Sequence, residues 1–545
     1  MYGNKMDSKR NESVASLTNY FAENTSMHGI SRFIGKPGFF RRAFWVLAVL
    51  TGSGVAVYNI WTIGIAYSRW EVSTLVSLEY NSKLRFPAVT ICNLNPVKKS
   101  SIEVEETEFD SLKTALRYEN ASEPMDNEDF YDWENSSVSY DTYDSNYRAT
   151  IDFQKALLQM KTARRIQIGH QLHDMLIECS FQGKVCTPSN FTRFYNYMHG
   201  NCYTFVPTDV DYTFISQTGP LYGLSMMLYV EEAEYISSFS SGVGFKVVVH
   251  SPDTMPFPED EGFDISPGFA TSAGVTKVTV ERVPAPYGNC KLYGPGVEEP
   301  PNIFTTQVPN ITYSDKTCKK TCVQKILVSL CDCCYNIYPC NPAALGIINS
   351  SITSAVRFCS LKGETKESCA EEVLDELDNE QRVCPDSCYP NCKEDTHQME
   401  ISTAMWPASN RLTRLVDGLI RGFENKQGAQ PIDKHASAAE KDTFFREIDH
   451  FIFTKGRLFR RNVMKLNVFY KDLNYQKIQT KPAYDWKSLL SDVGGQAGLW
   501  LGFSLLTLAE ILELILDVVL HLCTRPFRPN KGQVNPGQKR DEKQF

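Results

Sequence analysis

The sequence predicts an α+β membrane protein in which two transmembrane helices flank a large disulfide-rich extracellular domain. Three observations lead to this fold class. Two long apolar segments lie near the ends of the 545-residue chain, 16 of its 17 cysteines fall between them, and the intervening residues alternate strand-like and helix-like runs. The net charge of −8 gives no reason to expect a nucleic-acid partner, which would call for a basic face.

The first apolar segment covers residues 43–68, which contain no charged side chain. About 20 apolar helical residues cross a bilayer core, so this segment is predicted as transmembrane helix 1. A cleaved signal peptide is the alternative, but the segment starts late and lacks a small-residue cleavage site. The second segment is uncharged from Val493 to Ala509 and mostly apolar to Leu522, which predicts transmembrane helix 2 within residues 489–522.

Charges beside these segments predict the topology. Basic residues flank them on their outer sides: Lys36, Arg41 and Arg42 before the first, and Arg525, Arg528 and Lys531 after the second. The positive-inside rule then places residues 1–42 and 523–545 in the cytosol and residues 69–488 outside. We expect a multi-pass protein of the plasma membrane, with lipid around its helices.

Cysteines and glycosylation sequons agree with this topology. An even number of cysteines lies between the spans, as an oxidising compartment favours. Five sequons also lie there, at Asn120, Asn135, Asn190, Asn310 and Asn349. Two more, at Asn11 and Asn24, are expected to be cytosolic and unmodified. Cys523 follows the second span, where reversible acylation is one interpretation.

Strand patterns recur through the extracellular domain. Val89–Ile91 after the first span and Lys465–Tyr470 before the second each predict a strand, and together they suggest one sheet standing over the membrane. Residues 203–289 contain further strand-like runs, "GFKVVVHS" and "TKVTVERV". The stretch from residue 151 to 181 has helical periodicity.

An acidic insert occupies residues 101–152, with aromatic side chains in its second half. One interpretation is an exposed, glycosylated and flexible insert. The other is a docking surface for a cationic, aromatic ligand, held by charge pairing and cation–π contacts. The candidate ligand-site residues are Asp129, Tyr131, Asp132 and Trp133.

A cysteine-dense block follows, from Cys290 to Cys392. The spacings Cys318-x3-Cys322 and Cys384-x3-Cys388-x3-Cys392 place thiols on one face of a helix, which predicts a ladder of disulfides between antiparallel helices. A metal site would need reduced thiols, so no metal is expected.

The second apolar segment carries two stripes. Gly494, Gly498 and Gly502 share one helix face, where small residues allow close packing or an opening of the backbone into a pore lining. The acids Glu510, Glu513 and Asp517 share a face as well. Acids at bilayer depth usually face water, so an oligomer would present them as anionic rings. The alternative is a packing helix whose acids reach the cytosol.

At these residues the chain resembles the degenerin/epithelial sodium channel/acid-sensing ion channel family. The matching motifs are His28-Gly29, "FPAVTICNLNP", "GNCYTF" at 200–205, the cysteine block, "LNYQKIQTKPAYDWKSLLSDVGGQAGLWLG" and "SLLTLAEILE". The resemblance covers residues 28–520 and is strongest to invertebrate neuropeptide-gated (FMRFamide-type) sodium channels.

The resemblance implies a homotrimer, so that each chain has two further identical subunits as partners. It also implies a palm, a β-ball, a finger at about 101–200, a thumb at about 288–395 and a knuckle. Sodium would be the permeant ion, amiloride a pore blocker, and no cofactor or enzymatic activity is expected. The implied disulfides are Cys92–Cys202, Cys179–Cys186, Cys290–Cys392, Cys318–Cys388 and Cys322–Cys384.

The resemblance also implies roles for individual residues. The selectivity filter falls on Gly502, Phe503 and Ser504, where Phe503 replaces the small residue that many members carry. Pore and gate positions are Ser491, Gly494, Gly495, Gly498, Glu510, Glu513 and Asp517. His28 and Gly29 match the cytosolic gating motif, and Trp70 and Tyr287 match the aromatic pair that couples the thumb to the first span.

The stimulus is predicted from a departure from the family. Proton-gated members carry a histidine pair after the first span, but Glu71 and Val72 stand there in this chain. We therefore expect gating by a short amidated peptide, with a proton-gated or constitutively active sodium channel as the alternative. An ATP-gated trimeric channel would need clustered basic residues. A two-span ecto-enzyme would need phosphate loops, and a non-conducting receptor has no use for intramembrane acids.

Overall fold

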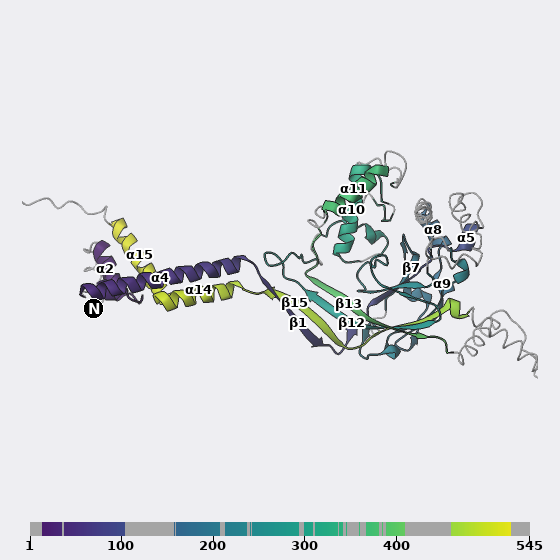
Figure 1. The fold of residues 1–545 in the computed structure, drawn as a ribbon, viewed down its shortest axis with the longest axis horizontal. Helices are drawn as coiled ribbons and strands as arrows, with labels where there is room; N and C mark the ends of the chain where they lie inside the picture. Colours follow the sequence, from purple (N-terminus) through teal and green to yellow (C-terminus); the bar gives the residue numbers. More distant parts are fainter. Residues whose placement is uncertain are drawn as a thin grey trace, which may run out of the picture. The chain divides into compact units, whose positions relative to one another are not determined.

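A computed structural model describes the protein at residues 14–34, 38–103, 157, 160–207, 213–236, 240, 242–293, 299–308, 311–335, 337–341, 345, 359, 367–380, 384, 388–408 and 459–524. The chain forms two compact units (Figure 1). One combines residues up to 73 with those from 481 onward, and we call it the helical unit. The other comprises residues 74–480 and contains the sheets, and we call it the sheet unit.

The helical unit contains α2 (Val14–Asn24), α3 (Ile30–Ile34), α4 (Phe39–Ser68), α14 (Trp486–Leu501) and α15 (Leu505–Thr524). Among the described residues, α4 is the one helix long and apolar enough to cross a membrane. Its 30 residues span about 45 Å, and it begins four residues before the predicted segment. Gly52 and Ala56 are its buried residues, and α4 packs against α14. The small side chains of Gly52 and Ala56 allow this close approach.

The second predicted span is two helices, α14 and α15, separated by residues 502–504. The acids of the second stripe lie on α15. Because the segment is broken and carries these acids, neither of its helices alone has the length and apolarity of α4.

Three sheets form the sheet unit. The first residues of β1 and the last residues of β15 belong to the helical unit. The eight-stranded sheet has the order β1-β15-β12-β14-β9-β4-β5, and β13 pairs with β12; the five-stranded sheet has the order β11-β10-β3-β7-β6; and β2 pairs with β8. The strands are β1 (Val72–Tyr80), β2 (Leu84–Arg85), β3 (Ala88–Asn93), β4 (Leu176–Phe181), β5 (Lys184–Val185), β6 (Phe191–Asn196), β7 (Gly200–Phe205), β8 (Phe214–Ile215), β9 (Leu224–Tyr229), β10 (Phe245–His250), β11 (Phe263–Ile265), β12 (Phe269–Glu281), β13 (Lys393–Met405), β14 (Val463–Tyr470) and β15 (Asn474–Pro482).

Short helices lie between these strands along the chain. They are α5 (Lys99–Glu103), α8 (Thr162–Ile168), α9 (Leu172–Met175), α10 (Asp315–Cys331), α11 (Glu367–Glu380) and the 3₁₀ turns η2 (Pro188–Asn190), η3 (Pro220–Tyr222), η4 (Glu232–Glu234) and η5 (Ile303–Thr306). The largest core lies between the two main sheets and contains Phe86, Phe245 and Tyr470, each almost fully buried. β14 alternates buried and half-buried side chains, as its sequence pattern predicts.

Two predictions about the sheets are wrong. The strands after the first span and before the second do not share a sheet, because β3 lies in the five-stranded sheet and β14 in the eight-stranded one. The elements next to the helices are instead β1 and β15, which neighbour each other. The helical pattern predicted up to residue 181 ends at Met175, because Leu176–Phe181 pairs with β9 as strand β4.

The thumb, which we define as the segment from Cys290 to Cys392, is held by six nested disulfides. From the outermost inward they are Cys290–Cys392, Cys318–Cys388, Cys322–Cys384, Cys331–Cys369, Cys333–Cys359 and Cys334–Cys340. With Cys92–Cys202 and Cys179–Cys186, all five expected pairs are bonded. Figure 1 shows α10 beside α11, which Cys331–Cys369 joins.

The cysteine ladder is only partly helical. Cys318 and Cys322 lie on α10 as predicted. Cys388 and Cys392, however, do not lie on a helix, because Pro390 accepts from the amide of Lys291 and Cys392 donates its amide back to Lys291. Proline disfavours a continuing helix, so this stretch pairs with another part of the chain instead.

Candidate functional site

The break between α14 and α15 is built by a glycine in a left-handed conformation. Gly502 has φ +65° and caps α14, donating its amide toward the carbonyls of Ala497 and Gly498. A side chain at this φ would be strained, so glycine suits the position. The Oγ of Ser504 accepts from the amide of Thr507 at 3.2 Å and begins α15. Gly502, Phe503 and Ser504, the predicted filter residues, are therefore the non-helical link itself.

A segment from the N-terminal part of the chain lies against this break. The amide of His28 donates to the carbonyl of Leu501 at 3.0 Å. A Cβ added to Gly502 would come within 2.5 Å of the His28 ring, so the glycine leaves room for the histidine. Gly29 has φ +85° and a Cβ there would meet Val49 of α4 at 2.7 Å. His28 and Gly29, the predicted gating motif, therefore lie where the chain turns, with His28 against the break and Gly29 against α4.

Glu510 anchors the same segment one turn further along α15. Its Oε2 accepts from the Thr25 hydroxyl at 3.0 Å and from the Ser26 amide at 3.1 Å. The Ser26 hydroxyl also lies 2.7 Å from the Thr507 hydroxyl. The sequence suggests an acid for this position but not its partners, since Thr25 and Ser26 are 484 or more residues away.

The other predicted pore residues lie along α14 and α15. Ser491, Gly494 and Gly495 are exposed on α14, and open space surrounds a Cβ at either glycine. On α15, Glu513 is exposed and Asp517 is half-buried.

A polar bridge between α4 and α14 was not predicted. Asn59 donates to the Oε1 of Gln496 at 2.8 Å, and the indole of Trp500 donates to the same oxygen at 3.2 Å. The signal was available, because an asparagine inside an apolar span usually has a partner.

The remaining predicted site residues are placed one by one. Trp70 packs on Tyr67, with ring centroids 4.8 Å apart, and belongs to the helical unit, whereas Tyr287 belongs to the sheet unit. The candidate ligand residues, which are Asp129, Tyr131, Asp132 and Trp133, lie outside the described residues, as do the sequons at Asn120, Asn135, Asn310 and Asn349. Asn190 is described, at the end of η2, where its Oδ1 accepts from the Thr187 amide.

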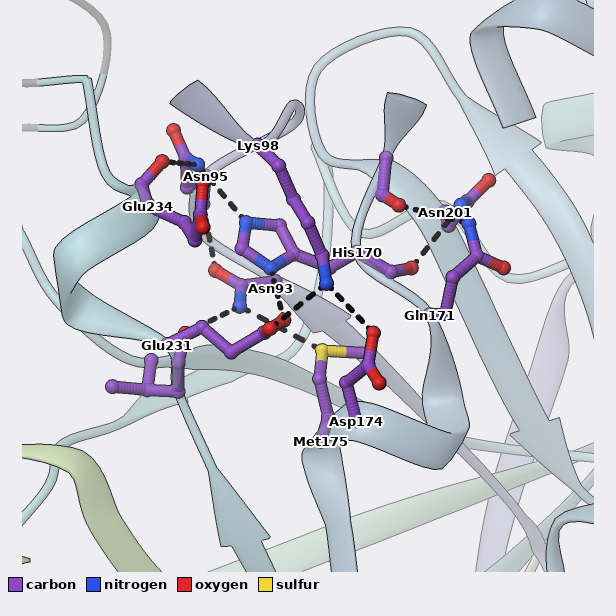
Figure 2. Close-up of polar contacts among 12 residues, drawn as sticks. Asn93, Asn95, Lys98, His170, Gln171, Asp174, Met175, Asn201, Glu231 and Glu234 are labelled. Carbon is purple, nitrogen blue, oxygen red and sulfur yellow. Dashed lines mark hydrogen bonds and ion pairs between the residues drawn. The ribbon is translucent and has the colours of Figure 1, made fainter. Parts of the chain in front are cut away.

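The sheet unit contains a second polar centre, built on the "NLN" of the family-like motif (Figure 2). The buried Asn95 donates its Nδ2 to His170 Nε2 at 2.9 Å. The ring proton of His170 is therefore assigned to Nδ1, which donates to Glu231 at 2.7 Å. The equally buried Asn93 donates to the carbonyl of Val230, so both asparagines fix the turn that carries Glu231.

Lys98 completes this cluster, as Figure 2 shows. Its Nζ lies 2.8 Å from Glu231 and 2.7 Å from Asp174. Burial alone would raise the pKa of Glu231, but the hydrogen bonds from His170 and Lys98 outweigh it and hold that pKa below its ordinary value. Burial opposes the charge of Lys98 as well, yet the two carboxylates raise its pKa. The cluster ties α9, η4 and the segment after β3 into one charged network.

The helices α14 and α15 are separated by three non-helical residues, 502–504, and the hydroxyl of Thr507 and the carboxylate of Glu510 lie beyond this break on α15. Such an interrupted helix is an arrangement suited to passing ions. The chain matches the family described as "Amiloride-sensitive sodium channel" over residues 21–514. It therefore belongs to that family, whose members are ion channels and not enzymes.

Individual relatives are similar over almost the whole chain. The epithelial sodium channel subunit alpha of Xenopus laevis is 25% identical, covering 93% of this chain and 82% of the relative. The FMRFamide-activated amiloride-sensitive sodium channel of Cornu aspersum is 25% identical, covering 96% and 85%. The epithelial sodium channel subunit gamma of Rattus norvegicus is 26% identical, covering 92% and 81%.

Proposed function

We propose that the chain is one subunit of a trimeric, amiloride-blocked sodium channel of the plasma membrane, opened by a short amidated peptide of the FMRFamide type. The observation that carries the pore part of this proposal is the interrupted helix at Gly502–Ser504, with the N-terminal segment seated against it. Two spans cannot enclose a pore alone, so conduction requires several copies around an axis.

Gating by peptide is supported by three features. Glu71 and Val72 stand where proton-gated relatives carry histidines, which removes the side chains that titrate near neutral pH. The acidic, aromatic insert at 101–152 has the chemistry to hold an arginine-phenylalanine peptide. A relative of similar identity from Cornu aspersum is an FMRFamide-activated channel. A ligand opens such a channel by binding the open state better than the closed one.

The first test is whole-cell current in cells that express this chain alone. FMRFamide should evoke an inward current that reverses near the sodium equilibrium potential and is blocked by amiloride. The same peptide with a free carboxyl terminus serves as the control for recognition of the amide. A current evoked by an acid step, together with silence to peptide, would replace peptide gating by acid gating.

A ligand-independent variant separates the pore from the stimulus. Ser491→Phe places a bulky side chain at the position where such residues hold family members open, and should give a standing amiloride-blocked current. If this variant conducts while the wild type ignores peptide and acid, the pore assignment stands and the ligand assignment fails. If it carries no current although it reaches the cell surface, the gate assignment at Ser491 is contradicted.

The proposed ligand contacts are tested by substitution. Asp129→Asn, Asp132→Asn and Trp133→Leu should move the peptide dose–response curve to higher concentration without altering the reversal potential. Arg148→Gln in the same insert is the matched control. The positive charge of Arg148 would repel a cationic peptide, so its removal should not move the curve to higher concentration. Unchanged curves for all three variants would place the ligand elsewhere.

A further inference from the structure

A cavity of about 580 Å³ lies in the sheet unit, and none of the residues of the Glu231 cluster lines it. This volume falls in the range of about 300–1,000 Å³ typical of small-molecule sites. Its walls come from the start of α8, the end of β6, the loop at 255–259, η5 and the thumb residues 337–340. The side chains that matter below are Lys161, Arg165, Phe257, Glu259, Phe304 and Tyr338.

One wall carries positive charge without a described counter-ion. Arg165 stacks on Tyr195, with its guanidinium carbon 4.8 Å from the ring centroid, and its Nη2 donates to Thr162 at 3.1 Å. Its Nε is buried without a hydrogen-bond partner. Neither Arg165 nor the neighbouring Lys161 forms an ion pair with any carboxylate in the described part of the chain. A guanidinium has five N–H donors, so most of those on Arg165 remain to be used.

The lining also contains an acid, Glu259, whose charge is already neutralised. Glu259 accepts from Lys320 at 2.8 Å and from the side chain of Asn196 at 2.8 Å, and its side chain is only 7% exposed. Lys320 also pairs with Asp260 at 2.8 Å. Among the described residues, a ligand in the cavity would therefore meet two cationic side chains that have no ion-pair partner and an acid that already has one.

Aromatic rings form another part of the lining, and the Lys320 ammonium lies over two of them, 4.4 Å from the centroid of Phe257 and 5.6 Å from that of Tyr338. Phe257 and Phe304 meet edge to face, with ring centroids 5.1 Å apart, and Tyr338 packs against Phe304 at 6.4 Å. Such faces favour a planar apolar group.

We propose that this cavity is a binding site for a small aromatic carboxylate. The carboxylate would lie against Arg165 and Lys161, because a guanidinium matches carboxylate geometry with two parallel hydrogen bonds. The ring would lie among Phe257, Phe304 and Tyr338. The ligand differs in charge from the cationic peptide of the proposed function, so this site would be a second, separate one that bridges α8 and the thumb.

The test measures equilibrium binding of radiolabelled N-acetyl-tryptophan to the purified full-length protein in nanodiscs. N-acetyl-tryptophanamide, which has the same ring and no charge, is the competitor that isolates the carboxylate. We expect saturable binding of the acid and competition by the amide that is weaker by about tenfold or more. Equal competition would overturn the carboxylate assignment, and no specific binding would overturn the site.

Variants locate the binding within the cavity. Arg165→Gln should weaken binding of the acid about tenfold, whereas Arg164→Gln, one position earlier on the same helix, should leave it unchanged. Tyr338→Leu should weaken binding and Tyr338→Phe, which keeps the ring, should preserve it. Thermal unfolding of each variant checks the fold. Binding that is indifferent to both Arg165→Gln and Tyr338→Leu in folded protein would place the ligand outside this cavity. The peptide-evoked current does not enter this test.

Discussion

Glu510 is, with Thr507, a residue through which the N-terminal segment is held to α15. A single carboxylate oxygen accepts from the Thr25 hydroxyl and the Ser26 amide. Glu513, three residues later, is exposed and makes no such bond among the described contacts. The two acids look alike in the sequence, but their contacts differ. Glu510 holds the N-terminal segment that lies against the break, whereas Glu513 contributes its negative charge alone.

This difference predicts unequal effects of two equivalent substitutions. Glu510→Ala should release the N-terminal segment from the filter region and lower the sodium-over-potassium permeability ratio by roughly threefold or more. Glu513→Ala should change conductance more than selectivity, because it removes a charge without unseating a segment. Reversal potentials in mixed sodium and potassium solutions measure both. Equal loss of selectivity in the two variants would contradict the anchoring role.

Glu231 gives the sheet unit an acid-sensitive point. Its pKa is lowered in the folded protein, so its contribution to stability is present above its unfolded pKa of about 4.5 and is lost as the pH falls through the folded value. Glu231→Gln should cost about 2 kcal/mol at pH 7 and flatten the acid side of the stability curve. Thermal unfolding between pH 3.5 and 8 tests this.

Glu232 provides the neighbouring control for Glu231. Its ion pair with Arg461 is largely exposed on the arginine side, so Glu232→Gln should cost little and leave the pH dependence intact. If the stability of the wild type and of Glu231→Gln falls in the same way at acid pH, other carboxylates control unfolding.

At the scale of elements, the break in the second span depends on Gly502, which the spacing alone cannot distinguish from Gly494. Gly494 is an ordinary helical residue with open space around it, whereas Gly502 has a positive φ and faces the His28 ring. The spacing suggests only that both lie on one helix face. The resemblance to the family, not the periodicity, singles out Gly502 as a filter position.

Alanine at each glycine should therefore give opposite results. Gly502→Ala is expected to abolish or strongly reduce current, because the side chain is strained at φ +65° and displaces His28. Gly494→Ala should be tolerated, since alanine is about 1 kcal/mol more favourable than glycine within a helix. Current density normalised to surface protein decides between them. A normal current from Gly502→Ala would show that this conformation is not needed for conduction.

Elements were predictable where the pattern was local. The strands β3, β10, β12 and β14 follow from runs of β-branched and alternating residues. β1 was missed, although Val76, Leu78 and Tyr80 alternate with polar residues in a usable signal. Which strands share a sheet could not be predicted, because pairing is decided by contacts between residues hundreds of positions apart. The same holds for the partners of Glu510 and His170.

At the scale of the whole molecule, the expected topology distinguishes two sequons, Asn190-Phe191-Thr192 and Asn24-Thr25-Ser26. Asn190 ends η2 in the sheet unit, with its Oδ1 bonded and its surroundings partly exposed. Asn24 ends α2, and Thr25, the middle residue of its sequon, is buried against Glu510. Asn190→Gln should remove one glycan, seen as a faster band that matches partial digestion by a glycosidase. Asn24→Gln should leave the band unchanged, and a shift there would contradict a cytosolic N-terminus.

The nested order of the thumb disulfides has a consequence for biosynthesis. From the innermost bond outward, the second cysteines are Cys340, Cys359, Cys369, Cys384, Cys388 and Cys392. A chain that enters the secretory compartment from its N-terminal side delivers these cysteines in that same order. Each bond can then close as its second thiol arrives, around a loop already shortened by the bonds inside it. The disulfides of the thumb can therefore form one after another during translocation, from the innermost to the outermost. No correct bond has to be broken before the next one forms.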